Sequence, residues 1–126
     1  MSKIFNEITY LDEFEKDKKK LSKRFKTLHD DIEMFINVQL KLYHKLQIDN
    51  NSILKIENLG VQYPKIYKVK KFACKSLKGK GVQSGIRIIY AYYPDLDKID
   101  LIEMYYKGDK ENEDRDRILK NYKPIK

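Results

Sequence analysis

The sequence predicts an α+β domain, in which a small antiparallel sheet carries two N-terminal helices on one face and is followed by a short C-terminal helix. Hydrophobic residues recur with a helical period over residues 11–46, and with a period near two in segments between residues 66 and 107. A highly charged stretch follows at 109–121. With 126 residues, 41% of them hydrophobic, the chain is long enough to form one core. We therefore expect a single domain spanning residues 1–126.

The N-terminal half is expected to form a strand and then a helical hairpin. Residues 4–10 alternate as a short strand. Residues 11–28 and 31–46 each place a row of apolar side chains on one helical face, and Asp30 is a suitable N-cap for the second helix. Residues 53–61 are too apolar for a free loop and are expected to pack as a short helical turn. The apolar helix positions are Leu11, Phe14, Leu21, Phe25 and Leu28, then Ile32, Phe35, Ile36, Leu40, Tyr43 and Leu46.

The C-terminal half is expected to form a three-stranded meander. Its strands are predicted at 66–74, 85–93 and 98–107. Because the apolar alternation of the first strand changes phase, a β-bulge is expected near Lys70 and Lys71. The strand at 4–10 is expected to add at an edge of this sheet, with both N-terminal helices on one face. Residues 109–121 are expected to form a short surface helix.

The positive charge of the chain is concentrated in one segment. Residues 1–63 hold 11 basic and 10 acidic side chains, and residues 95–126 hold 8 and 9. No Asp or Glu lies between Glu57 and Asp95, so residues 64–94 supply the formal net charge of +8. A block of one sign concentrates polyanions. The phosphate backbone of RNA or DNA is therefore the first expected partner.

Composition and motifs argue against several other classes of function. No apolar run approaches the roughly 20 residues of a membrane helix, and the N-terminus lacks the basic-then-apolar order of a signal peptide. We therefore expect a cytoplasmic protein without a membrane partner. Cys74, the single cysteine, cannot form an internal disulfide or a Cys-based zinc cage. The glycines at 79–85 lack a Walker ending, and the acidic run at 109–116 lacks EF-hand spacing. Neither a metal nor a cofactor is expected.

Residues 70–118 carry the motifs most typical of a known family. They combine a basic hairpin ending in SLKG, a strand that reads GIRIIY, and a closing strand that runs into a polar tail. Together with the predicted order of elements, these motifs resemble the RelE/ParE toxin superfamily of type II toxin–antitoxin systems. The resemblance implies a sheet whose concave face binds nucleic acid, and a cognate antitoxin protein as partner. RelE-type members cleave mRNA on the ribosome, whereas ParE-type members inhibit DNA gyrase and cleave nothing themselves.

The resemblance also implies two sets of site residues. The expected catalytic residues are Arg87, Tyr106, Lys107 and Lys71. The expected RNA-binding residues are Lys68, Lys70, Lys75, Lys78, Lys80 and Tyr105. Because the C-terminal half contains no His, members that cleave without a His are the closer model.

The chemistry of RNA cleavage is compatible with these residue types. Attack by a 2′-hydroxyl needs a base, a positive charge at the scissile phosphate, and an acid for the leaving 5′-oxygen. Arg87 can hold two phosphate oxygens. Lys70 or Lys71 could act as the base if neighbouring cations lower its pKa. Tyr105 or Tyr106 could stack on a base of the RNA or donate a proton.

Other interpretations of the same features remain open. The lysines could form a surface for an acidic antitoxin or for nucleic acid without catalysis, and Arg87 could pair with Glu103 across the sheet. His29 and His44 are expected to be surface or packing residues. We favour an mRNA interferase, an endoribonuclease that acts on ribosome-bound mRNA. A ParE-type gyrase inhibitor and a non-toxic basic binding module are the alternatives.

Overall fold

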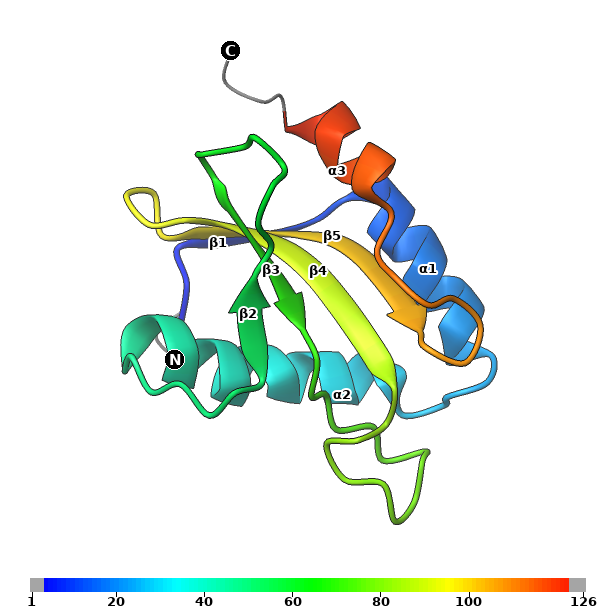
Figure 1. Cartoon of the computed structure of the whole chain (residues 1–126). Coiled ribbons are helices and arrows are strands. Elements are labelled where there is room, and N and C mark those ends of the chain that lie inside the picture. Colours follow the sequence, from blue (N-terminus) through cyan, green and yellow to red (C-terminus); the bar gives the residue numbers. More distant parts are fainter. Residues whose placement is uncertain (1–3, 123–126) are drawn as a thin grey trace.

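The computed structural model describes residues 4–122 and has an α+β fold built on a five-stranded sheet (Figure 1). Its elements are β1 (Glu7–Tyr10), α1 (Asp12–Ser22), α2 (Leu28–Met34), η1 (Phe35–Lys45), β2 (Ile53–Lys55), β3 (Lys65–Val69), β4 (Ile86–Tyr93), β5 (Lys98–Tyr106) and α3 (Arg115–Asn121). The strand order is β1-β5-β4-β3-β2. The predicted fold class is confirmed. Within residues 4–122, no helix is long and apolar enough to cross a membrane.

The predicted meander is present, and β1 lies at an edge of the sheet as expected. β3, β4 and β5 pair in antiparallel order. β1 runs parallel to β5, with Ile8 opposite Ile99, so the sheet is mixed and not wholly antiparallel. α2 continues directly into η1, a π-helix, and together they form the second helix of the predicted hairpin.

The prediction of a helical turn at 53–61 is wrong. Residues Ile53–Lys55 form β2, which pairs with β3 and places Ile53 opposite Val69. Ile53 is buried whereas Leu54 is 40% exposed, which is the alternation of a strand. β3 would otherwise leave its backbone unpaired at the sheet edge, and β2 satisfies those groups.

The predicted β-bulge lies in a different strand. Tyr90 of β4 is opposite Leu101, whereas Ile89 is opposite Glu103, so Ile102 is the extra residue on β5. The bulge shifts the alternation of β5, so that Leu101 and Met104 lie in one hydrophobic cluster and Ile102 and Tyr105 in the other. β3 ends at Val69, before the residues at which the bulge was expected.

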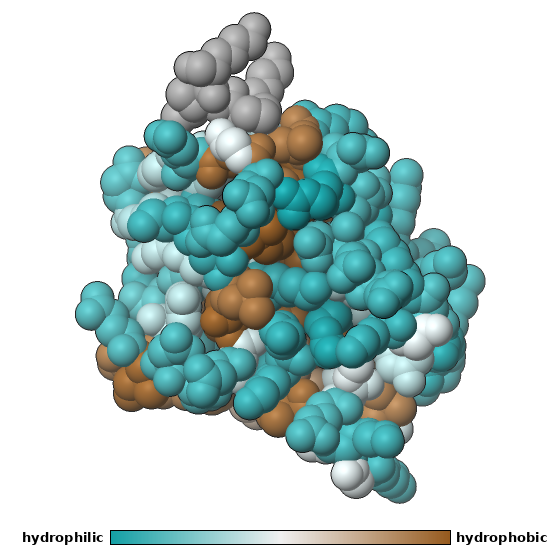
Figure 2. Space-filling view, viewed as in Figure 1, coloured by the Kyte–Doolittle hydropathy of each residue, from teal (hydrophilic) through white to brown (hydrophobic). Residues whose placement is uncertain are grey.

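Each face of the sheet is covered by its own hydrophobic cluster. α1, α2 and η1 pack on one face, here called the helical face, through Phe14, Leu21, Ile32, Phe35 and Leu40. α3 covers the other face, here called the tail face, where Ile118 and Tyr122 pack with Ile66, Ile89, Ala91, Ile102 and Tyr105. Figure 1 shows α2 passing along one side of the sheet and α3 beside α1. The surface seen from this side is mostly hydrophilic, with apolar side chains in separate patches (Figure 2).

Candidate functional site

Most of the predicted RNA-binding lysines lie in the loop that joins β3 to β4. This segment, residues 70–85, is called the basic loop, and it projects from the end of the sheet (Figure 1). Lys75, Lys78 and Lys80 are exposed. Among residues 4–122, none of these three forms an ion pair, although ion pairs are frequent elsewhere in the chain. Their charges therefore face solvent without a partner.

Hydrogen bonds fix the basic loop to the start of α2. The buried Asp31 carboxylate accepts from the Thr27 hydroxyl at 2.7 Å and from the Lys75 backbone N–H at 3.2 Å. The Thr27 and Ser76 hydroxyls are 2.8 Å apart. On the other side of the loop, the buried Ser84 hydroxyl donates to the Phe72 carbonyl at 2.5 Å. Polar bonds of this kind hold the loop backbone, so the lysines project from a fixed frame.

Lys70 and Lys71 stand at the start of the basic loop and use their backbones in its structure. The Lys70 N–H donates to the Ser52 carbonyl at 2.8 Å. The Lys71 carbonyl accepts from Gln39 Nε2 of η1 at 2.7 Å. Lys70 is exposed and Lys71 is half-buried.

Arg87 lies next to the basic loop on the tail face. It is directly opposite Tyr105 in the β4–β5 pairing, and its Nη1 donates to the Lys70 carbonyl at 2.8 Å. It does not pair with Glu103, which instead bonds Lys110. Arg87 is half-buried and has no ion pair within residues 4–122. Its remaining N–H groups are available to an anion.

Tyr106 faces the opposite way. It pairs with Ile86 and packs on the helical face, where its ring centre is 5.3 Å from that of Phe25 and the Arg24 guanidinium lies 5.0 Å from the ring centre. Adjacent residues of a strand point to opposite faces, so Arg87 and Tyr106 do not converge. The structure therefore does not bring these two expected catalytic residues together on one face of the sheet. Lys107 is exposed, and its N–H donates to the Gly85 carbonyl at 2.8 Å.

Lys68 and Tyr105 lie on the tail face beneath the C-terminal segment. Lys68 Nζ is 2.9 Å from Glu113 Oε1, and both side chains are largely buried. Burial alone would lower the pKa of Lys68, but its bond to Glu113 raises it, so Lys68 stays charged. The pKa of the Tyr105 hydroxyl is raised, chiefly by burial. These two residues are therefore covered, unlike the lysines of the basic loop.

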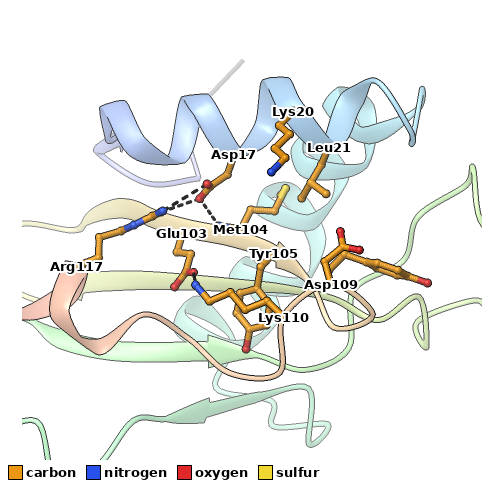
Figure 3. Close-up of a pocket in the computed structure, with 10 residues that line it drawn as sticks. Asp17, Lys20, Leu21, Glu103, Met104, Tyr105, Asp109, Lys110 and Arg117 are labelled. Atoms are coloured by element: carbon orange, nitrogen blue, oxygen red, sulfur yellow. Dashed lines mark hydrogen bonds and ion pairs between the residues drawn. The ribbon is translucent and has the colours of Figure 1, made fainter.

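A charged cleft of about 300 Å³ lies between α1 and the end of β5 (Figure 3). Asp17 of α1 accepts from the Met104 N–H at 3.0 Å and from Arg117 Nη1 at 2.7 Å. Glu103, 1% exposed, bonds Lys110 and accepts from the Asp114 N–H at 2.8 Å. These contacts hold residues 107–117 against the sheet. Since the charges are paired, the cleft offers little net charge to a ligand.

The two histidines differ in their surroundings. His29 is exposed, as expected. His44 of η1 is half-buried among tyrosines, with its Nε2 2.7 Å from the Tyr90 hydroxyl. Burial, and to a lesser degree the charge of Lys45, lowers the pKa of His44 to about 4. His44 is therefore neutral at physiological pH, as a packing histidine should be.

Sequence reasoning missed the partners that neutralise the tail face. Lys110 and Glu113 were not expected to lie near the predicted site, because the polar tail was expected to form a surface helix from residue 109. Glu103 was considered only as a partner of Arg87, and it bonds Lys110 instead. The alternation of β5 could have placed Glu103 on a buried face. Within the described residues, no group of three or more His, Cys, Asp or Glu side chains could hold a metal ion.

Comparisons with family models, with curated proteins and with solved structures find no match.

Proposed function

We propose that this protein binds the phosphate backbone of RNA through the basic loop and Arg87, and that it acts as the toxin of a toxin–antitoxin pair on ribosome-bound mRNA. The observation that carries the proposal is that the lysines of the basic loop form no ion pair with the described residues, whereas Lys68 and Arg117 are paired with carboxylates. Lys75, Lys78 and Lys80 are exposed without ion pairs and project from an anchored loop. Lysines in such an arrangement attract phosphates and release counterions when they bind them.

Arg87 extends this surface onto the sheet. It contacts the backbone of Lys70 and so lies at the base of the basic loop. A guanidinium beside a row of lysines can hold a phosphate with two parallel hydrogen bonds. An RNA strand lying along the loop would therefore bring one phosphate to Arg87.

Cleavage of the bound RNA is the second part of the proposal, and Arg87 is the residue placed to act in it. Its remaining N–H groups can stabilise the charge that develops on a scissile phosphate. Tyr105 is buried beneath the C-terminal segment and Tyr106 lies on the opposite face of the sheet, so neither hydroxyl is placed to donate a proton to RNA bound at the basic loop.

The cognate antitoxin would compete for the same lysines. A partner with acidic side chains would neutralise the basic loop and exclude RNA from it. Such a complex would explain how a cell tolerates the protein.

Induced expression in bacteria, with pulse labelling of protein and DNA synthesis, tests this function. We expect protein synthesis to stop first, with primer-extension stops inside translated messages. Arg87→Ala should relieve the arrest, whereas Tyr106→Phe should not. A stop in DNA synthesis alone would indicate the gyrase alternative. Unchanged growth would favour a non-toxic binding module and contradict the toxin proposal.

A further inference from the structure

A second hollow, distant from the basic loop, lies where the end of η1 meets the sheet. It has a volume of about 480 Å³ and is called the tyrosine pocket. Its walls and rim are formed by Tyr43, His44, Gln47, Asp49, Lys65, Tyr67, Tyr92 and Pro94. In Figure 1 the end of η1 and the β4–β5 turn lie on the same side of the molecule, while the basic loop projects elsewhere. A pocket of this size is typical of small-molecule sites.

Aromatic rings form the walls of the tyrosine pocket. The rings of His44 and Tyr92 lie against each other at a tilt, with centres 4.1 Å apart and planes at 32°. Tyr43 and Tyr67 meet edge to face, with centres 5.7 Å apart. Because His44 is neutral at physiological pH, this wall carries no charge of its own. Flat, uncharged rings suit a planar ligand that stacks.

The hydroxyl groups in the tyrosine pocket are left free. The Tyr90 hydroxyl beneath it bonds His44. In contrast, the hydroxyls of Tyr43, Tyr67 and Tyr92 make no hydrogen bond with any residue in the range 4–122. Tyr67 is only 8% exposed, so its hydroxyl lacks a hydrogen-bond partner within that range although the residue is buried. Hydroxyls in such a hollow can serve a polar ligand as donors or acceptors.

The rim of the tyrosine pocket carries an amide and both signs of charge. Gln47 follows the end of η1 with φ of 56°. This left-handed conformation normally favours glycine at the end of a helix. The left-handed conformation is less favourable for glutamine than for glycine. Because the Gln47 side chain lines the pocket, we infer that it contributes to ligand binding there. Asp49 and Lys65 add a carboxylate and an ammonium group.

We propose that the tyrosine pocket binds a single unpaired nucleotide whose base carries an exocyclic amino group. The base would stack on the aromatic wall, as bases do on tyrosine in single-strand binding sites. Gln47 and Asp49 are residue types that hydrogen-bond amino-bearing base edges, and Lys65 would hold the phosphate. Such a ligand has an amino group for Asp49 and an anionic group for Lys65, so it matches both charges of the rim. A simple cation would instead be repelled by Lys65.

Calorimetric titration of the full chain with AMP tests this site, with UMP and ribose 5-phosphate as ligand controls. We expect AMP to bind, UMP to bind about tenfold more weakly, and ribose 5-phosphate not to bind. Tyr92→Leu should weaken AMP binding by about tenfold, the loss expected for one stacked base. Tyr63→Leu removes an exposed tyrosine outside the pocket and should leave AMP binding unchanged.

Gln47→Gly separates a binding role from a structural one. Because glycine relieves the left-handed backbone, the melting temperature should stay equal or rise while AMP binding falls. Equal binding of AMP and ribose 5-phosphate, no AMP binding at millimolar concentration, or unchanged AMP binding in Gln47→Gly would overturn the proposal.

Two further experiments show whether the ligand is a free nucleotide or part of an RNA, and whether the tyrosine pocket binds it independently of the basic loop. Tight binding of AMP itself would indicate a free nucleotide. Much tighter binding of oligoadenylate, lost in Tyr92→Leu, would indicate an unpaired base within RNA, and either result supports the site. Replacing Lys75, Lys78 and Lys80 by Gln should leave AMP binding intact, even if the basic loop proves not to bind RNA. Loss of AMP binding in that variant would place the nucleotide elsewhere and contradict the proposal.

Discussion

The cations of the basic loop and those paired at the C-terminal segment carry the same charge but have opposite surroundings. Lys75, Lys78 and Lys80 are exposed and form no ion pair with the described residues. Lys68 and Arg117 are largely buried against Glu113 and Asp17. The difference shows that a block of positive charge in a sequence divides into structural and available parts once the carboxylates that reach it are known.

The largest effect on stability is expected at Asp17. Asp17→Ala removes the closest carboxylate from Arg117, whose side chain is 13% exposed, and leaves the Met104 N–H without its acceptor. Breaking such a buried pair should lower the free energy of unfolding by about 3 kcal/mol. Urea denaturation measures the change. Lys16→Ala, at an exposed position of the same helix, should stay within about 0.5 kcal/mol of the wild type; an equal loss in both variants would refute the structural role of the pair.

A smaller, pH-dependent loss is expected at Glu113. Burial alone would raise the pKa of this carboxyl, but the bond to Lys68 and its charge lower it below 4.5. A lowered pKa in the folded state adds stability above the unfolded pKa, and this stability is lost as the pH falls through the folded value. Glu113→Gln should therefore lower the free energy of unfolding by about 2 kcal/mol at pH 7.

The difference in the free energy of unfolding between Glu113→Gln and the wild type should disappear in acid. Urea denaturation at neutral and at low pH measures this difference. Glu111→Gln, which alters an exposed carboxylate of the same segment, should leave the stability unchanged at both. A difference that persists undiminished in acid would show that the pairing with Lys68 is not its cause.

The smallest effect is expected at Tyr106. Its hydroxyl makes no hydrogen bond with another described residue, and its ring supplies the contacts with Phe25 and Arg24. Tyr106→Phe keeps the ring and should change the unfolding free energy by less than about 0.5 kcal/mol. It should also leave RNA binding unaltered. Weaker RNA binding in this variant would mean that the RNA reaches the helical face of the sheet.

Much of the fold follows from periodicity that the sequence displays openly. The helical spacing of Phe14 and Leu21, and of Ile32, Phe35 and Leu40, places these residues in one cluster under the sheet. β2 could not be foreseen in the same way, because three residues are too few to establish an alternation. Its formation depends on pairing with the free edge of β3, and no local pattern within β2 signals that pairing.

The candidate site was predicted less completely than the fold. Charge counting located the basic loop, since no carboxylate occurs in its sequence. The same counting could not separate Lys68 from Lys75, because Glu113 reaches Lys68 from 45 residues away. Nor could it separate the faces of Arg87 and Tyr106, which depend on the register of β4 against β5.

The central claim is that the unpaired lysines of the basic loop bind RNA phosphates. The salt dependence of binding to a labelled single-stranded RNA, measured by fluorescence anisotropy, tests it most directly. Replacing Lys75, Lys78 and Lys80 by Gln should weaken binding and reduce the slope of log K against log salt by about 2, from roughly 0.7 per lost phosphate contact. The control variant replaces the exposed Lys16, Lys19 and Lys41 by Gln, which removes the same charge from helices. If both variants lose affinity and slope equally, binding follows net charge alone and the account is contradicted.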